Sequence, residues 1–536
     1  MKNKPRFISG PPGTGKTHTF IVNQYKELIK EYSPENIIII SHTNVAVREI
    51  KNAILDLEEV KAQGYDLKFY EHRICTIHSY CKSKLMRKEV FDIDDHTNLI
   101  NINRRFGIDR RSIEKHEFYR IIKLARGQKL TPLEFWKKEK PHLDIYDIKE
   151  ILRLYEIYVK YKEDNYKCDY QDMIDEFRLR AVDPKIDVLI VDEAQDSNIT
   201  QIDAIEKMAK NVKNNHYYLI GDADQTIFEF AGSNPHYFHE LSKNPYLELK
   251  EGKRCSEAIN NICRKIIQPI WTQYGYSRVW TPALYTERHN RGNIGEIIKG
   301  NGFRLPSLEY GSSHLEKLFD KIKNTNETFL FTYRGNPSDQ RCTEFFKNHG
   351  LEYASVEFGA HVSKKELRCY KEWPLFVDGK ALPLSQIKDF WDYLGTQVIC
   401  RGKKDKNVFK GWTEKFYTIN FLVQKGLVRE NYRQYRDLDR AIPPAQGKKE
   451  KIIDIKRILN SNYDLEKEIQ IYHGNIHQIK GTTFDNVIVD HTRVRREDYF
   501  RQLRLTYTGY SRGIYDYWEL ARHPKSKFIL GARDNI

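Results

Sequence analysis

The residues with the clearest chemistry form a glycine-rich segment near the N-terminus. It matches the spacing Gly-x-x-x-x-Gly-Lys-Thr between a short apolar run and a helical pattern, the context in which such a loop binds a triphosphate. Its glycines allow backbone amides to wrap around phosphates, and the following helix N-terminus adds positive potential. We expect Lys16 to reach the β- and γ-phosphates and the Thr17 hydroxyl to bind Mg²⁺. The predicted nucleotide-binding residues are Gly10, Pro11, Pro12, Gly13, Thr14, Gly15, Lys16 and Thr17.

An acidic pair, Asp192-Glu193, supplies the partner that this loop needs. Asp192 would hold the Mg²⁺ shell, and Glu193 would orient and deprotonate the attacking water. Two acids at the end of a strand are usually only solvated, so this interpretation depends on the glycine loop in the same chain. Together the two motifs predict hydrolysis of ATP with Mg²⁺ as the cofactor.

The elements that must position these motifs are short apolar strands separated by helical stretches. Each strand is followed by polar residues, and the helix after the glycine loop should run over residues 17–31. Continuous apolar strands of this kind are typical of a parallel α/β sheet, in which ligands bind at the carboxyl ends of the strands. The predicted strands are residues 6–9, 37–40, 188–191 and 217–220.

A second α/β pattern follows, with predicted strands at 328–331 and 487–489, and each half carries an insertion. The first insertion is charged and helix-like, and the second is of irregular composition with basic runs. The expected domains are a first core at 1–81 and 166–250, its helical insertion at 82–165, a second core at 251–344 and 451–536, and its insertion at 345–450.

The bulk composition narrows the partners. The 536 residues carry a formal net charge of +15 with a pI of about 9.1, which suits a polyanion, although an AT-rich genome also enriches lysine. Hydrophobic residues make up 40%, and no apolar run approaches the ~18 residues that span a bilayer. The eight scattered cysteines form no Cys-x-x-Cys pair, which favours reduced thiols. We therefore expect no membrane partner and a cytoplasmic location, in a bacterium or a phage-infected host.

The longer acidic segment Asp192-Glu193-Ala194-Gln195-Asp196 has the form Asp-Glu-x-Gln-Asp. With it, the chain resembles the UvrD/Rep-like helicases of superfamily 1. The motifs diverge from those of the family, and together with the AT-rich composition and compact size they favour a phage or mobile-element gene. The other matching motifs fall in family order at residues 41–49, 76–79, 169–172, 221–230, 333–336, 476–484 and 504–512.

The resemblance implies two RecA-like parallel-sheet motor domains in tandem, each with a mainly helical insertion domain. It implies that Gln225 senses the γ-phosphate and that Arg254 and Arg512 neutralise the transferring phosphoryl group, as a planar, permanently charged guanidinium can. The expected catalytic set is therefore Lys16, Glu193, Gln225, Arg254 and Arg512. Gly481 joins the residues expected to bind the nucleotide.

The resemblance also implies a set of DNA-binding residues. Phe228 and Phe230 stand where the family places aromatic rings that stack on bases, with core packing as the alternative, and His42 replaces a third ring. Thr43, Thr76 and His78 would hold the phosphate backbone. The complete set is His42, Thr43, Asn44, Thr76, His78, Phe228, Phe230, Arg334 and His477.

Three departures from the family concern recognition of the base. The family places a glutamine-bearing segment that reads adenine some tens of residues before the glycine loop, whereas this sequence begins nine residues before Gly10. Lys253 stands in place of an aromatic residue, and Thr483 in place of a glutamate. We expect weak discrimination among nucleoside triphosphates, with a start site upstream as the rival explanation.

The predicted function is that of an ATP-dependent DNA helicase or single-stranded DNA translocase that moves 3′→5′. One alternative is a translocase that remodels nucleoprotein or serves a partner nuclease with little unwinding. A second is a nucleotide-switched DNA-binding sensor. The expected partners are single-stranded DNA, single/double-strand junctions, and a nuclease or replication, repair or defence proteins. The sequence leaves the pathway, the host and the oligomeric state open.

Overall fold

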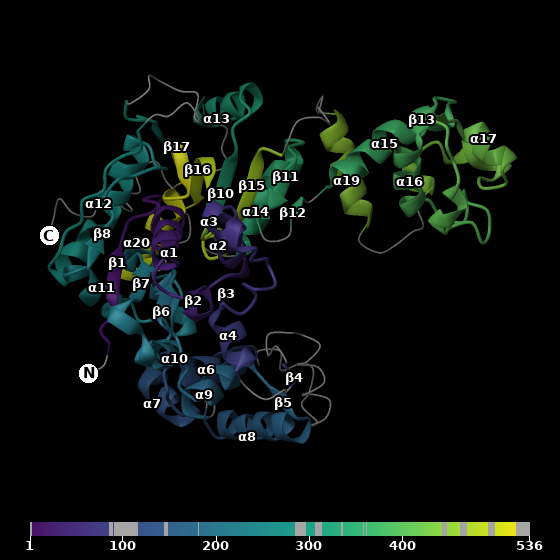
Figure 1. Cartoon of the computed structure of the whole chain (residues 1–536). Coiled ribbons are helices and arrows are strands. Elements are labelled where there is room, and N and C mark those ends of the chain that lie inside the picture. Colours follow the sequence, from purple (N-terminus) through teal and green to yellow (C-terminus); the bar gives the residue numbers. More distant parts are fainter. Residues whose placement is uncertain are drawn as a thin grey trace. The chain divides into compact units, whose positions relative to one another are not determined.

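The computed structural model of the protein describes most of the chain (Figure 1). The described residues are 3–84, 89–90, 116–143, 148–180, 182–284, 296–305, 313–333, 336–356, 359–360, 362–441, 448–460, 469–490 and 499–520. They belong to two compact units, each built around its own sheet. The first unit comprises residues 1–301, 495–515 and 529–536, and the second comprises 302–494 and 516–528.

The first unit contains a six-stranded sheet in the order β3-β2-β6-β7-β1-β8, and every adjacent pair is parallel. Its strands are β1 (Arg6–Ser9), β2 (Ile37–Ser41), β3 (Ile74–Thr76), β6 (Val188–Val191), β7 (Tyr217–Gly221) and β8 (Leu247–Glu248). The register pairs Ser9 with Gly221 and Ile40 with Val191. The glycine loop and the acidic pair therefore leave the same edge of the sheet.

Alternation along the strands divides the first unit's core into two layers. Ile38 and Ile40 of β2 pack in one hydrophobic cluster, whereas Ile37 and Ile39 pack in another. Both faces of the sheet are covered, which is why this strand is continuously apolar. The covering elements include η1 (Lys16–Val22), α1 (Asn23–Leu28), α2 (Asn44–Leu55), α3 (Glu58–Gln63), α4 (Ile77–Ser83), α9 (Tyr170–Arg180), α10 (Ile199–Met208) and α11 (Pro235–Lys243).

Three helices fill much of the predicted first insertion. They are α6 (His116–Gly127), α7 (Pro132–Leu143) and α8 (Ile148–Asp164), and Figure 1 shows them grouped with α9. Strands β4 (Glu89–Val90) and β5 (Lys167–Cys168) form a short parallel pair. Two later helices, α12 (Glu257–Tyr274) and α20 (Tyr499–Tyr510), complete the first unit and contact each other.

The second unit contains a seven-stranded sheet in the order β12-β11-β15-β10-β16-β17-β9. The pairs of β15 with β10 and β11, of β10 with β16, and of β17 with β9 are parallel, whereas β12 is antiparallel to β11. The strands are β9 (Gly302–Leu305), β10 (Phe329–Tyr333), β11 (Tyr353–Ser355), β12 (Gly359–Ala360), β15 (Ile471–Asn475), β16 (Phe484–Asp490) and β17 (Gly513–Leu520). Helices α13 (Ser313–Asn324), α14 (Asn336–Asn348) and α19 (Lys448–Asn460) accompany it.

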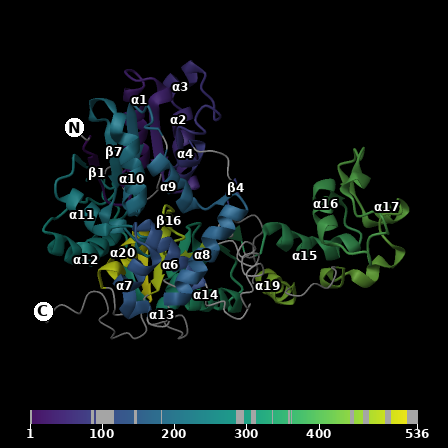
Figure 2. The same cartoon turned by 90° about the horizontal axis from the view of Figure 1, so that it is seen from below.

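The second insertion has a hydrophobic core of its own, built on Trp373, Phe390 and Trp391. Figures 1 and 2 both show its helices α15, α16 and α17 grouped together. Its elements are α15 (Lys364–Val377), β13 (Leu382–Pro383), α16 (Leu384–Tyr393), η10 (Lys406–Phe409), β14 (Phe416–Tyr417), α17 (Ile419–Gln424), η11 (Glu430–Tyr435) and α18 (Leu438–Ala441). Strands β13 and β14 pair antiparallel.

The predicted α/β class with two parallel sheets is confirmed. The predicted strands agree closely with β1, β2, β6 and β7, while β10 and β16 extend beyond the predicted ranges. The predicted domain limits stay a prediction. The two compact units have other limits than the predicted domains, because residues 251–301 and 495–515 group with the first sheet. Within the described ranges, every helix is too short or too polar to span a membrane.

Candidate nucleotide-binding site

The glycine loop makes a tight turn between β1 and η1. Gly13 and Gly15 have φ values of +73° and +80°, which L-residues with side chains rarely adopt. A Cβ on Gly13 would lie 2.4 Å from the Arg254 Cβ, and the backbone N–H of Lys253 donates to the Gly13 carbonyl at 2.8 Å. The loop is therefore closed from one side by the segment that carries Arg254.

Lys16 lies inside the loop and is buried. Its Nζ donates to the carbonyls of Gly10 at 2.8 Å and Pro11 at 3.2 Å. Burial lowers the pKa of the Lys16 ammonium, and the carboxylates of Asp222 and Glu193 oppose that effect. The ammonium is thus placed where the loop's carbonyls converge, at the start of η1.

Thr17 and Asp192 offer oxygen ligands to a divalent cation. The Thr17 hydroxyl donates to Asp192 Oδ2 at 3.3 Å, and Asp192 Oδ1 is buried with no hydrogen-bond partner among the described residues. Burial, and then the neighbouring Glu193, raise the pKa of Asp192 to about 7. A hydroxyl and a buried carboxylate oxygen are the hard donors that Mg²⁺ takes, so these residues fit the predicted metal.

Glu193 has a left-handed backbone, with φ of 50° and ψ of 37°. This conformation is strained for a residue other than glycine and often marks a functional position. Gln195 Nε2 donates to the Glu193 carboxylate, and Gln195 Oε1 accepts from the Asp222 backbone N–H at 3.2 Å. Gln195 therefore fixes Glu193 relative to the neighbouring strand β7.

The structure brings the other predicted catalytic residues to this site through Ser511. Gln225 Nε2 donates to Ser511 Oγ at 3.2 Å, Arg512 Nη2 donates to the same oxygen at 3.0 Å, and Arg254 Nη1 donates to the Ser511 carbonyl at 3.4 Å. Burial and then Arg254 lower the pKa of Arg512 to about 10, with Glu193 opposing. Arg512, which is buried, and Arg254, which is partly buried, therefore add positive charge to the site, and the carboxylate of Glu193 acts on both.

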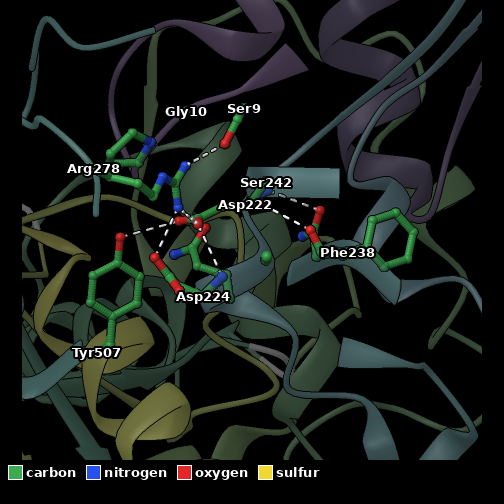
Figure 3. Close-up of polar contacts among 12 residues, drawn as sticks. Ser9, Gly10, Asp222, Asp224, Phe238, Ser242, Arg278 and Tyr507 are labelled. Atoms are coloured by element: carbon green, nitrogen blue, oxygen red, sulfur yellow. Dashed lines mark hydrogen bonds and ion pairs between the residues drawn. The ribbon is translucent and has the colours of Figure 1, made fainter. Parts of the chain in front are cut away.

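Two contributors were missed by sequence reasoning. Ser511 lies inside a motif that the resemblance identifies, but its bridging role depends on a partner far away in the chain. Arg278 lies outside every recognised motif, and nothing in its neighbourhood signals its role. Figure 3 shows its guanidinium between Ser9, Asp222 and Asp224, directly below the start of the glycine loop.

The predicted DNA-binding residues on β2, β3 and their following helices lie at the ends of paired strands. Thr43 caps α2, which begins at Asn44, and Thr76 caps α4. His42 Nε2 is hydrogen-bonded to Ser197 Oγ at 2.9 Å rather than presented only as a stacking ring. Burial and then Lys123 lower the pKa of His78 to about 4, so this imidazole is neutral at pH 7 and would contact a phosphate only as an uncharged donor.

The remaining predicted residues are only partly open to description. Phe228 is half-buried just before η8 (Glu229–Ala231), while the Phe230 side chain and Arg334 lie outside the described residues. His477 and Gly481 follow β15 in the second unit, and Gly481 has φ of +90°. Their predicted contacts with DNA and nucleotide stay predictions.

Comparison with known proteins finds a family match for the first part of the chain. Residues 1–245 match the UvrD/REP helicase N-terminal domain. This match covers the first 245 of the chain's 536 residues. The predicted resemblance to the UvrD/Rep-like helicases is thus confirmed, and the low identities below agree with its divergence.

Three curated relatives illustrate the distance. The chain is 24% identical to the ATP-dependent DNA helicase Rep of Buchnera aphidicola subsp. Acyrthosiphon pisum, over 69% of this chain and 58% of the relative. It is 25% identical to a probable DNA helicase II homolog of Mycoplasma pneumoniae, over 80% and 60%. It is 23% identical to the ATP-dependent DNA helicase PcrA of Bacillus subtilis, over 68% and 50%. The chain thus spans between half and three fifths of the length of these relatives.

Proposed function

We propose that the protein is an ATP-dependent DNA helicase or single-stranded DNA translocase. The observation that carries this proposal is the grouping of three cations at one glycine loop within a single compact unit: Lys16 lies inside the loop, Arg254 lies against Gly13, and Arg512 joins Arg254 through Ser511. Burial disfavours the charged forms of Lys16, Arg254 and Arg512, and a polyphosphate supplies the negative charge that compensates them. Relatives named ATP-dependent DNA helicases support ATP as the triphosphate and DNA as the polymer.

In this proposal the chain's own groups perform the hydrolysis. Glu193, held by Gln195, orients the attacking water and accepts its proton. Arg254 and Arg512 neutralise charge that spreads over the transferring phosphoryl group. Thr17 and Asp192 would hold a Mg²⁺ ion, which would supply further positive charge to the phosphates.

The DNA side of the proposal starts one residue after Gln225. The segment that follows carries Phe228, and Arg504 of α20 donates from Nε to the Thr226 carbonyl at 3.0 Å. The same helix leads directly into Ser511 and Arg512. The residues predicted to contact the γ-phosphate are therefore connected, through a few covalent and hydrogen bonds, to the segment that carries Phe228, whose aromatic ring is suited to base stacking.

Surface charge in the second unit also favours a polyanionic partner. The stretch 401–436 contains ten lysines and arginines against three acidic residues. Nearly all of these basic side chains are exposed on the small insertion core, and some, such as Arg436 with Asp378, form surface ion pairs. Basic groups that face solvent attract nucleic acid through release of counterions from its phosphates.

The decisive experiment measures ATP turnover with and without single-stranded DNA. We expect DNA to stimulate the wild type, and Glu193→Gln to retain ATP binding within about threefold while turnover falls at least ~100-fold. Glu240→Gln is the matched control, because this exposed glutamate pairs with Lys243 on α11, and it should behave like the wild type. Equal turnover in the wild type and Glu193→Gln would contradict the proposal.

Strand displacement separates the mechanical alternatives. A duplex with a 3′ tail should be unwound and one with a 5′ tail should not, if movement is 3′→5′ as the resemblance implies. DNA-stimulated turnover without displacement would instead favour a translocase that serves a partner nuclease or remodels nucleoprotein. Turnover that DNA does not stimulate would favour a nucleotide-switched sensor.

A further inference from the structure

A buried polar cluster centred on Arg278 lies directly below the start of the glycine loop. Arg278 Nη2 donates to Ser9 Oγ at 2.9 Å, while Nη1 donates to Asp222 Oδ1 at 2.5 Å and to Asp224 Oδ2 at 2.8 Å. The side chain of Arg278 is 2% exposed, and both carboxylates are fully buried. Figure 3 shows the guanidinium between these three acceptors.

A second ring of donors fixes the two carboxylates from other elements. Tyr507 of α20 donates its hydroxyl to Asp222 Oδ2 at 3.2 Å. Trp271 of α12 donates Nε1 to Asp224 Oδ2 at 2.8 Å, and the Tyr276 hydroxyl reaches Asp224 Oδ1 at 3.4 Å. The cluster therefore joins four separate segments: the start of the glycine loop, the turn before Gln225, the end of α12, and α20.

The charges inside the cluster make Arg278 indispensable to its geometry. Asp222 and Asp224 raise the pKa of Arg278 against the effect of burial, so the guanidinium stays charged. His239 lies 3.9 Å from Asp224, but burial and the nearby Arg504 lower its pKa to about 3 and keep it neutral at pH 7. Arg278 is thus the cation that is hydrogen-bonded to both carboxylates, and its planar guanidinium can donate to acceptors on two sides, which a lysine ammonium does not do in the same geometry.

The carboxylates that Arg278 holds sit next to two predicted catalytic groups. Asp222 caps the short turn η7 (Ala223–Gln225), and the Gln225 backbone N–H donates to the Asp222 carbonyl at 2.9 Å. Asp222 also opposes the burial effect on Lys16. On the other side, Ser9 immediately precedes Gly10. One side chain thus fixes both the loop that holds the phosphates and the turn that carries Gln225.

We propose that Arg278 is a positioning residue for nucleotide hydrolysis. It holds Gln225 and the glycine loop at fixed positions relative to each other. The inference rests on the proposed hydrolysis of ATP. It goes beyond that proposal because it assigns a role to a buried residue whose guanidinium is bonded to Ser9, Asp222 and Asp224 and which lies outside the predicted nucleotide-binding set. If this relative position is lost, ATP should still bind through the loop, but the γ-phosphate should be poorly aligned for reaction.

Arg278→Lys tests this inference because it keeps the charge and removes the fork. Arg126→Lys is the matched control: Arg126 also bridges carboxylates in the first unit, the buried one of Asp169 and the partly buried ones of Asp172 and Asp175, and it is not among the predicted nucleotide-binding or catalytic residues. We expect both variants to lose similar thermal stability. Only Arg278→Lys should lose turnover, with kcat falling about 10- to 100-fold and KM for ATP changing less than threefold.

The outcomes separate the two proposals. If the wild type and Glu193→Gln hydrolyse ATP equally, the proposed function fails and the role of Arg278 fails with it. If the wild type is active and Arg278→Lys keeps kcat within twofold, or if Arg126→Lys loses as much, Arg278 is only structural and the inference is overturned. Should Arg278→Lys not fold, Trp271→Phe removes one donor to Asp224 and should lower kcat about threefold or more with unchanged KM; an unchanged kcat would overturn the inference.

Discussion

Gln225 donates a hydrogen bond from Nε2 to Ser511 Oγ at 3.2 Å, across 286 residues of sequence. The same hydroxyl oxygen accepts from Arg512 Nη2 at 3.0 Å and donates to the Thr508 carbonyl at 3.0 Å. Ser511 thus holds a predicted phosphate sensor and a predicted phosphate-binding arginine through one atom. Removal of the Ser511 hydroxyl is therefore the smallest substitution that should disturb both Gln225 and Arg512.

Ser511→Ala should therefore lower ATP turnover without unfolding the first unit. Loss of hydrogen bonds worth about 1 to 1.5 kcal/mol corresponds to roughly a tenfold fall in kcat. Ser511→Thr keeps the hydroxyl and should retain most activity. Steady-state kinetics with saturating ATP and single-stranded DNA provides the measurement.

A matched serine exists elsewhere in the same unit. Ser242 Oγ is buried and donates to the Phe238 carbonyl at 2.8 Å, and neither residue belongs to the predicted site. Ser242→Ala should leave kcat within twofold. Equal losses of activity in the two alanine variants would show that Ser511 matters only for packing.

Gly13→Ala should abolish nucleotide binding, and Gly64→Ala should not. Gly13 and Gly64 have φ values of +73° and +71°, so an added Cβ costs roughly 1–2 kcal/mol of backbone strain at either position. Only at Gly13 does that Cβ also meet Arg254, at 2.4 Å, whereas at Gly64 nothing lies within 4 Å. The pair therefore separates strain from steric displacement of the loop.

Equilibrium binding of a slowly hydrolysed ATP analogue measures the difference. We expect a dissociation constant at least ~30-fold higher for Gly13→Ala and unchanged for Gly64→Ala, with similar thermal midpoints for both variants. Unchanged affinity in Gly13→Ala would mean that Arg254 does not close the loop as the structure describes.

Contiguous motifs made much of the nucleotide site predictable. The glycine loop and the Asp192-Glu193 pair each consist of residues that are neighbours in the sequence. The four consecutive isoleucines of β2 likewise predict a strand that is buried on both faces. The resemblance to a family supplied Gln225, Arg254 and Arg512, which local chemistry alone does not separate from solvated surface residues.

Residues that act through distant partners escaped prediction. Arg278 lies 269 positions from Ser9 and more than 50 from Asp222 and Asp224, so only the folded chain reveals their cluster. The grouping of α12 and α20 with the first sheet is equally a tertiary fact. The left-handed backbone of Glu193 is imposed by its neighbours against the preference of glutamate, and weak discrimination among nucleotide bases stays a prediction.

Asp169→Asn should destabilise the first unit strongly, in a manner that depends on pH. Asp169 Oδ2 accepts from Arg126 at 2.8 Å and from Lys162 at 2.9 Å, and its side chain is 7% exposed. Removing the carboxylate leaves buried cations undercompensated, which typically costs about 3–5 kcal/mol. Asp378→Asn breaks a surface pair with Arg436 and should change the thermal midpoint little.

The sign of the pH dependence follows from the pKa of Asp169. Burial alone would raise this pKa, but Arg126 and Lys162 outweigh burial and hold it below the ordinary value of 3.8. The carboxylate's contribution is therefore fully present above about pH 4 and is lost as the pH falls through the lower, folded value. The gap in thermal midpoint between the wild type and Asp169→Asn should be equal at about pH 7 and pH 5.5 and should narrow only below about pH 4. A gap that narrows already near pH 6 would contradict this assignment.

Glu229→Gln should weaken the coupling between DNA and ATP more than it weakens hydrolysis itself. The buried Arg504 donates from Nε to Glu229 Oε1 at 3.0 Å and to the Thr226 carbonyl at 3.0 Å, so it ties α20 to the segment that carries Phe228. Gln225 and Ser511 lie at the other end of the same two segments.

A neutral glutamine at position 229 keeps the shape but loses the charge-assisted bond, worth about 1.5–3 kcal/mol where the pair is shielded from water. Basal turnover should stay within threefold of the wild type, while the stimulation by single-stranded DNA should fall about tenfold, measured as the ratio of kcat with and without DNA. Glu240→Gln, on the exposed face of α11, should leave that ratio unchanged. If basal and stimulated turnover of Glu229→Gln fell by the same factor, the Arg504–Glu229 pair would support the nucleotide site alone and would not connect it to DNA.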